Sequence, residues 1–435
     1  MITGLFLPAA GYWTVEGIGR GSGFYQATGS NNDSIHNGAS GANIPFDPGT
    51  SAPALSAHKI ALRNFTINGN RGTGANGNST SGNPQGNNPL TAIWCGINLL
   101  NADQVEVENV NLYDIAGYAL RLSNCAEVDI RNVRIEQPIG GIVNTDGIHL
   151  SGPCTNVRIL GGYLTGLGDD SIAINAPEGY GGNINGTLID GVTFNSVATM
   201  FRIYTAGTSA TTCMIDRVRI ANCQGTAVTF VCQMGLNANG GVVGAAHAIG
   251  SVEVDDCTFT APYFWPCSQN IDRLSFRNTT RLAPAQANAW VYTPINACAI
   301  GLVEFVDSRI VRNGNGSANA YAVDVENGAS VGCIHFDGFS LQDQPGSSYG
   351  AVPYLINCGS GTIGRVVIDA LDPHGITTLF SGSGIPSGCI ISGSGVLATG
   401  WTFPDANMAN GTPYLSANSG LASVKVNGTV KPLTS

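Results

Sequence analysis

The sequence predicts an all-β fold, a single-stranded right-handed parallel β-helix of about ten to twelve coils. Three observations support this prediction. Glycine accounts for 59 of the 435 residues, which is about twice its average share. Charged residues are only 11% of the chain, and the lysines that usually cover exposed helices are scarce. The third observation is a strand pattern that returns along most of the chain.

The repeated unit alternates apolar and variable positions, then has Asn, Asp or Gly, and then a second short apolar run. Successive units begin at intervals of roughly 22 to 34 residues. They start at Val105, Val128, Val157, Thr187, Val218, Val252, Leu274, Val303, Ile334 and Val366. Alternation of this kind predicts a strand with one buried face.

The Asn/Asp/Gly step predicts a bend, because these residues tolerate the left-handed backbone conformation. A single unit is too small to bury its own apolar face, so neighbouring units must stack at about 4.8 Å to form a continuous core. The units lack the leucine-asparagine signature and helix of a leucine-rich repeat. They are also shorter than a four-stranded propeller blade.

These patterns place the β-helix at residues 1–397 and a C-terminal cap or association tail at residues 398–435. We expect surface loops at about residues 68–89 and 233–250, where the core pattern is missing. No amphipathic capping helix precedes the first coil, which suggests that an upstream segment is missing. The tail and the two ends that need cover suggest association, with a homotrimer as the expected form.

Composition also limits the partners. The formal net charge of −10 disfavours nucleic acid and anionic membranes, and no apolar run is long enough to span a membrane. The start lacks the basic region of a signal peptide, so no intact signal peptide is expected in this chain. The spacing of the 12 cysteines fits neither zinc binding nor a small disulfide scaffold, and buried free thiols are the simplest interpretation.

One strand in each coil contributes to a wall with polar side chains facing outward. The strands are residues 118–123, 146–150, 169–174, 200–204 and 227–231, with apolar residues such as Val228 and Phe230 pointing inward. The outward positions are then Arg121, His149, Ser171, Arg202, Tyr204 and Thr229.

Three aspartates, Asp146, Asp169 and Asp170, stand at the strand starts of two adjacent coils. Asp146 and Asp169 are 23 residues apart, which is one coil, so their Cα atoms should lie about 5 Å apart. Carboxyl groups this close raise each other's proton affinity. A protonated carboxyl beside an ionised one is what acid/base cleavage of a glycosidic bond requires.

Other interpretations of these residues remain open. The aspartates could be turn residues that accept bonds from backbone amides, or they could bind Ca²⁺; otherwise no metal or cofactor is expected. Arg121, His149, Glu178, Arg202 and Tyr204 are candidates for substrate binding, and each could instead be an ordinary surface residue.

The run Asn144-Thr145-Asp146-Gly147-Ile148, followed by Gly168-Asp169-Asp170, resembles glycoside hydrolase family 28, the polygalacturonase-like enzymes of the pectate-lyase-like β-helix superfamily. The resemblance implies that Asp169 is the general acid and that Asp146 and Asp170 activate the water, with inversion. The coil-rich body and small-residue tail also resemble phage tailspike depolymerases.

The chain departs from the family pattern on the next two coils. The family has Gly-His-Gly and then Arg-Ile-Lys, whereas this chain has Thr199-Met200-Phe201 and then Val228-Thr229-Phe230. The resemblance therefore does not imply pectin as the substrate.

We expect an extracellular or virion-associated enzyme that hydrolyses a polysaccharide. The alternatives are a polysaccharide lyase, in which Tyr204 or His149 takes a proton next to a uronate, and a tailspike-type protein that binds glycan without turnover.

Overall fold

The structure is a computed structural model. It describes the chain except residues 9–10, 31, 38–51, 53, 72–93, 139–144, 206–212, 236–247, 284–288, 294–297, 313–320, 345–351, 373–375, 382–384, 420 and 434–435. The chain forms two compact units, Met1–Gly250 and Ser251–Ser435. Each unit is described by itself below.

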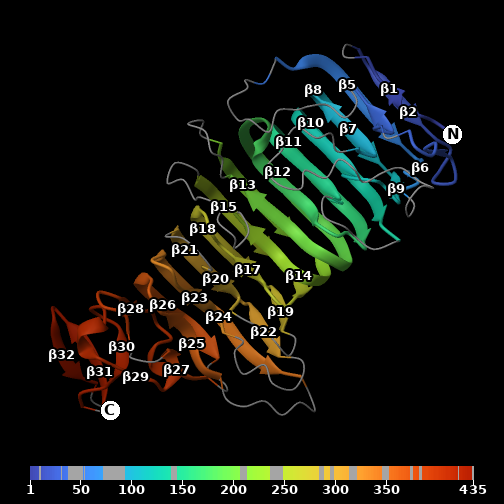
Figure 1. Cartoon of the computed structure of the whole chain (residues 1–435). Helices are drawn as coiled ribbons and strands as arrows, with labels where there is room; N and C mark the ends of the chain where they lie inside the picture. Colours follow the sequence, from blue (N-terminus) through green and yellow to red (C-terminus); the bar gives the residue numbers. More distant parts are fainter. Residues whose placement is uncertain are drawn as a thin grey trace. The chain divides into compact units, whose positions relative to one another are not determined.

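Unit 1 is built of coils whose strands form three walls, and each strand pairs in parallel with its counterpart in the next coil (Figure 1). The first wall contains β1 (Leu5–Phe6), β4 (Ile35–His36), β7 (Ile97–Leu100) and the first parts of β10 (Leu120–Glu136), β11 (Ile148–Thr165) and β12 (Asp170–Tyr204). The ends of β12 and β14 (Gln224–Met234) continue this wall.

The second and third walls follow in the same order. The second contains β2 (Trp13–Glu16), β5 (Ser56–Arg63), β8 (Ala102–Glu108), the middle parts of β10, β11 and β12, and β13 (Ile215–Ala221). The third contains β3 (Gly23–Tyr25), β6 (Thr66–Asn68), β9 (Asn111–Tyr113), the ends of β10 and β11, a later part of β12 and the start of β14.

The observed register confirms the predicted repeat. On the second wall of unit 1, Val105 pairs with Val128, Val128 with Val157, Val157 with Thr187, and Thr187 with Val218. In unit 2, Leu274 pairs with Val303, Val303 with Ile334, and Ile334 with Val366. The fold is the predicted right-handed parallel β-helix.

The predicted bends are left-handed at Asn/Asp/Gly positions. Asn109 and Asn132 have φ of 53° and 52°, and Gly161 has φ of 68° at the same bend of the next coil. The asparagines also bond from coil to coil, since Asn132 Nδ2 donates to Asn109 Oδ1 at 2.6 Å. A side-chain ladder therefore stabilises the bend between the second and third walls.

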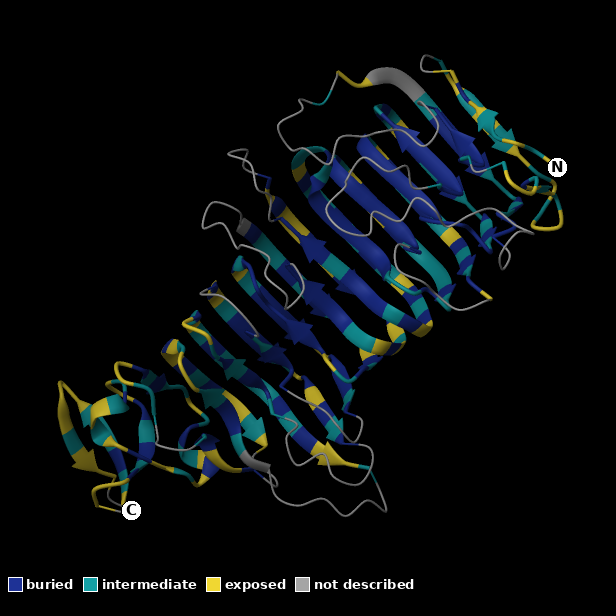
Figure 2. Cartoon of the chain, viewed as in Figure 1, coloured by how far each residue is buried: buried dark blue, intermediate teal, exposed yellow. Residues whose placement is uncertain are grey.

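The inward side chains of unit 1 form a continuous apolar core, seen as dark blue strand segments in Figure 2. All twelve cysteines are free thiols, and most are buried. Cys125 and Cys154 pair in register on adjacent coils. These positions confirm the prediction of buried thiols that pack as small hydrophobes.

Unit 2 has the same kind of coil pattern and an aromatic core. Phe276, Phe305 and Phe336 pair in register and stack at 5.4 and 5.5 Å between ring centroids. Trp290 is fully buried against them. The strands are the part of β15 (Ala248–Asp255) from Ser251, β16 (Thr258–Thr260), β17 (Trp265–Pro266), β18 (Asn270–Arg277), β19 (Thr280–Ala283), β20 (Val291–Tyr292), β21 (Ala299–Val306), β22 (Arg309–Arg312), β23 (Val323–Val325), β24 (Ser330–Asp343), β25 (Val352–Cys358), β26 (Thr362–Asp372), β27 (Ile376–Phe380) and β28 (Ile390–Ser392).

The end of the chain forms a separate four-stranded sheet of β29 (Thr402–Phe403), β30 (Pro413–Ser416), β31 (Ala422–Val426) and β32 (Thr429–Pro432). Asn427 and Gly428, with φ of 49° and 78°, make the turn of its β31–β32 hairpin, as an Asn-Gly pair does in a type I′ turn. The role of this sheet as a cap or association tail remains a prediction.

Two short 3₁₀ turns, Leu397–Thr399 and Asp405–Asn407, are the helical elements in the described ranges. Among the residues with described positions, no helix is long and apolar enough to cross a membrane. Most of the two predicted loops lies outside the described residues. At the described edges, Asn68 ends β6, Met234 ends β14 and β15 begins at Ala248, and the extent of the two loops remains a prediction.

Candidate functional site

The three aspartates lie at the starts of β11 and β12 on the first wall. Ile148 pairs with Ile172, and the Gly147 amide donates to the Asp170 carbonyl at 3.0 Å. This register places Asp146 beside Asp170, at the strand spacing of about 4.8 Å. The 23-residue interval had predicted Asp169 as the neighbour of Asp146, so the observed register differs by one residue. Asp169 precedes Asp170 at the same strand end.

The carboxyl groups differ in burial. Asp146 is 3% exposed and Asp170 is 7% exposed, whereas Asp169 is half-buried. Burial raises the pKa of Asp146 to about 7, although a hydrogen bond with His149 acts against this rise. Burial also raises the pKa of Asp170 well above its usual range, against the attraction of Arg202. The pair therefore retains a proton near neutral pH.

His149 lies at the centre of a hydrogen-bonded triad of ionisable groups, Asp146, His149 and Glu178. Its Nδ1 lies 2.6 Å from Asp146 Oδ2, and its Nε2 lies 2.6 Å from Glu178 Oε2. Tyr118 stacks on the imidazole with 4.1 Å between ring centroids. Burial acts to lower the pKa of His149, but the charge of Glu178 and the hydrogen bonds to both carboxylates raise it to about 9. At neutral pH the ring is an imidazolium that donates to both carboxylates.

Glu178 reaches His149 because its segment lies back over earlier coils. Gly179 pairs with Gly152, and a Cβ at Gly179 would lie 2.3 Å from Ser123 Oγ. Gly179 also has φ of 72°, so glycine is required both for conformation and for space. The close approach brings Glu178 against His149, which lowers the Glu178 pKa although burial acts against that.

The remaining predicted residues lie around the triad of Asp146, His149 and Glu178. Arg121 pairs in register with His149 and is 8% exposed, and its charge helps to lower the pKa of Glu178. Arg202 Nη1 donates to Gln233 Oε1 at 2.6 Å, and its guanidinium lies 5.6 Å from the Tyr204 ring centroid. Burial raises the pKa of Tyr204 to about 12.

One predicted strand of the wall is wrong. Residues 227–231 were expected to point Val228 inward, but Val228 is 66% exposed. Phe201 pairs with Cys232 and Ile203 with Met234, so Gln233, rather than Thr229, stands beside Arg202. The physical reason is two register shifts in β12, between Phe194 and Val197 and between Val197 and Thr199.

Two further corrections concern exposure and omissions. The outward positions His149 and Ser171 are 1% and 0% exposed, so outward direction did not mean contact with solvent. Sequence reasoning also missed Tyr118 and Gln233. Tyr118 is the first residue of the predicted strand 118–123, and alternation alone gave no signal that it stacks on His149.

No group of three or more His, Cys, Asp or Glu side chains within the described ranges has the geometry to hold a metal ion.

Stacked parallel coils with paired carboxylates at neighbouring strand starts define a parallel β-helix protein. More narrowly, residues 50–195 match the model of glycosyl hydrolases family 28. That segment contains all three aspartates, His149 and Glu178, and it ends before Arg202 and Tyr204. The match confirms the resemblance drawn from the sequence motifs.

No curated protein sequence matches the chain. Among solved structures, a mutant tailspike protein of E. coli bacteriophage HK620 in complex with a hexasaccharide is similar at 11% identity and a TM-score of 0.43, over 87% of this chain and 73% of that one. PfbA, a surface adhesin of Streptococcus pneumoniae, is similar at 12% identity and a TM-score of 0.42, over 100% of this chain and 92% of that one.

Proposed function

We propose that the protein is a glycoside hydrolase that cleaves a polysaccharide at the Asp146, Asp169 and Asp170 site. The observation that carries this proposal is the buried pair of Asp146 and Asp170 on neighbouring strands, with His149 bonded to Asp146 at 2.6 Å. The bond with the imidazolium favours the ionised form of Asp146, which can take a proton from the attacking water, and hydrolysis of a glycosidic bond needs such a base beside a second carboxyl that acts as the acid.

The roles follow the resemblance to family 28. Asp169 is the general acid. It is the one aspartate of the three that is not buried, so it has the best access to a glycosidic oxygen. Asp146 and Asp170 activate the water, and the reaction inverts the anomeric centre.

His149 is a positioning residue in this proposal. Its imidazolium bonds to Asp146 and Glu178 at 2.6 Å each, which fixes the orientation of the Asp146 carboxylate and favours its ionised form. Glu178 in turn fixes the His149 ring, and its other oxygen accepts a bond from Asn175 Nδ2 at 3.0 Å. Arg121 and Arg202 flank the site and would contact the glycan.

The electrostatics favour a hydrolase over a lyase. A lyase would need Tyr204 or His149 to accept a proton. The pKa of Tyr204 is raised to about 12 by burial and that of His149 to about 9 by its carboxylate partners. Both groups therefore hold their protons at neutral pH.

We also propose that the protein acts outside the cell or on a virion, as a homotrimer. The carbohydrate partner is the polysaccharide substrate. A tailspike-type protein that binds glycan without turnover remains the alternative, and the absence of the family's Gly-His-Gly motif is the observation that favours it.

The test is a panel of acidic and neutral polysaccharides assayed for new reducing ends and for ultraviolet absorbance. We expect reducing ends without the absorbance that an unsaturated lyase product would give. Asp169→Asn should lose the release of reducing ends. Asp190→Asn is its matched control, because Asp190 is a half-buried aspartate of β12 that accepts a hydrogen bond from Asn222 on the second wall. Polysaccharide binding without any new reducing ends would support the binding-only alternative.

A further inference from the structure

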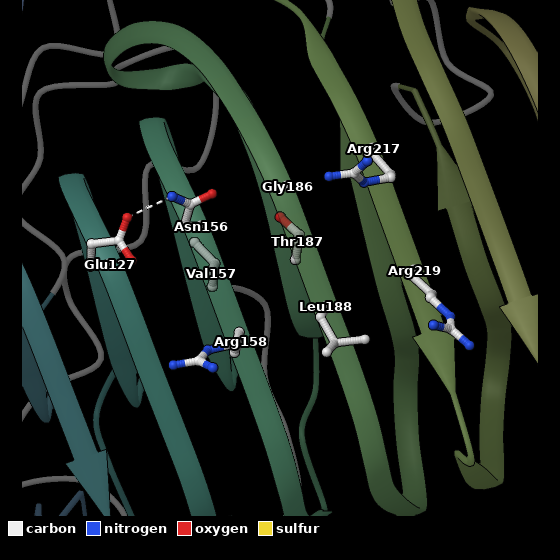
Figure 3. A pocket seen from close by; sticks show the side chains of 9 residues that line it. All are labelled: Glu127, Asn156, Val157, Arg158, Gly186, Thr187, Leu188, Arg217 and Arg219. Carbon is white, nitrogen blue, oxygen red and sulfur yellow. Dashed lines mark hydrogen bonds between the residues drawn. The ribbon is translucent and has the colours of Figure 1, made fainter.

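The second wall of unit 1 carries a hollow, whereas the three aspartates lie on the first wall. The hollow has a volume of about 440 Å³ and lies over the strand segment Gly186–Leu188. Figure 3 shows Asn156 and Arg158 on one side of that segment and Arg217 and Arg219 on the other. All of these residues belong to unit 1.

Gly186 provides the space at the centre. It has no side chain, and a Cβ built there would lie 3.5 Å from Asn156 Oδ1 and 4.0 Å from Arg217 Nη2. A small group seated above Gly186 would therefore meet a guanidinium on one side and an amide on the other. In Figure 3 the Arg217 side chain points toward Gly186.

Arg217 differs from its neighbours in lacking a partner. Arg158 forms an ion pair with Asp129 at 2.6 Å, and Glu127 accepts a hydrogen bond from Asn156 at 2.6 Å. Within the part of the chain that the structure describes, Arg217 makes no hydrogen bond or ion pair. Its guanidinium is an exposed fork of donors suited to a carboxylate.

The hollow continues into a second one of about 220 Å³, which shares Glu127 and Arg158 with it and extends to Lys59 and Gln104. In register, these positions form one row across successive coils from Lys59 to Arg217. Six strands at a spacing of about 4.8 Å span about 24 Å. The trough is long, shallow and lined by amides and charged groups, which fits an extended polar chain.

We propose that this trough binds an acidic oligosaccharide, with a sugar carboxylate held by Arg217 above Gly186. A dense polyanion such as nucleic acid fits less well, since Glu106, Glu127 and Asp129 also line the trough and the whole chain has a net charge of −10. A sugar chain with separated carboxylates places its charge at Arg217 and its hydroxyls at the amides. The choice of a saccharide over another carboxylate rests on the proposed function.

The experiment measures binding to short oligosaccharides by titration calorimetry in the Asp169→Asn background, which prevents hydrolysis. The probes are oligogalacturonate, hyaluronan and oligosialate fragments, each compared with its carboxyl-reduced form. We expect at least one acidic probe to bind more tightly than its reduced form, with the difference shrinking as salt is added. Arg217→Gln should lower the affinity for that acidic probe by about tenfold or more, as loss of a charge-assisted hydrogen bond does.

Arg365→Gln is the control, because Arg365 is an exposed arginine of β26 that does not line the trough. It should leave affinity unchanged, and melting temperatures should show that both variants fold. Equal affinity of Arg217→Gln and the parent for every acidic probe would overturn the proposed binding site. So would a single-stranded oligonucleotide that binds the trough as tightly as the acidic oligosaccharides do. If no polysaccharide is cleaved but Arg217→Gln still binds the acidic probe more weakly than the parent does, the proposed function fails while this site stands.

Discussion

Raising the pH from 6.5 to 9 should destabilise unit 1, because the His149 imidazolium loses its proton in this range. The folded-state pKa of about 9 lies above the ordinary value of 6.5. A group with a raised folded pKa contributes stability that is present below the unfolded pKa and is lost as the pH rises through the folded pKa. His149 is 1% exposed, so solvent screens this contribution little.

The size of this destabilisation follows from the two pKa values of His149. The difference between 6.5 and about 9, at about 1.4 kcal/mol for each tenfold change in proton affinity, corresponds to a loss of about 3 kcal/mol in the free energy of unfolding. Asp146, with a pKa raised to about 7, still titrates at the lower end of this range, and the comparison variant replaces it together with His149.

The assay is urea unfolding followed by circular dichroism at pH 6.5 and 9, with a reductant present because all twelve cysteines are free. The comparison is a neutral triple variant, Asp146→Asn, His149→Gln and Glu178→Gln, which keeps hydrogen-bonding groups of similar size and removes the three titrations. Wild type should lose about 3 kcal/mol more than this variant between the two pH values. Equal losses in both proteins would refute the assigned charge state of His149.

Three further predictions concern the ladder, the ions and the assembly. Asn132→Ala should lower the free energy of unfolding by about 1–2 kcal/mol in urea titrations, because alanine tolerates φ of 52° poorly and loses the bond to Asn109. Asn132→Gly should recover part of that loss. An Asn132→Ala variant as stable as wild type would contradict the stabilising role of the asparagine ladder. A chelator such as EDTA should leave activity unchanged, whereas a loss restored by Ca²⁺ would favour the calcium interpretation of the aspartates. Light scattering at micromolar concentration should give the mass of a trimer, and a clean monomer mass would remove the proposed assembly without touching the hydrolase proposal.

The fold was predictable because its signals are local. Asn109, Asn132 and Gly161 mark the same bend in successive coils, and each has the left-handed backbone that its residue type allows. The inward alternation before each bend then fixes the register, because a one-residue slip would expose the whole apolar face. The β14 strand is the exception, since the register shifts in the facing part of β12 leave no mark in an alternation pattern.

The candidate site was predictable only in part. The motifs placed Asp146, Asp169 and Asp170 together, but parity gives the direction of a side chain and not its exposure. His149 is therefore buried where a surface residue was expected. The contact between Glu178 and His149 depends on a segment that lies back over earlier coils, and no local pattern encodes that contact. The family's histidine is missing from the next coil, and the structure instead places His149 beside Asp146.

The most direct test of the hydrolase proposal is the turnover of Asp169→Asn on whichever polysaccharide the wild type cleaves. An amide cannot donate the proton, so the rate of reducing-end release should fall by about 10²–10⁴-fold. Glycan affinity and melting temperature should stay near those of wild type, because size and hydrogen-bonding capacity hardly change. Asp190→Asn should retain full activity. Wild-type turnover in a well-folded Asp169→Asn variant would contradict the assignment of Asp169 as the acid.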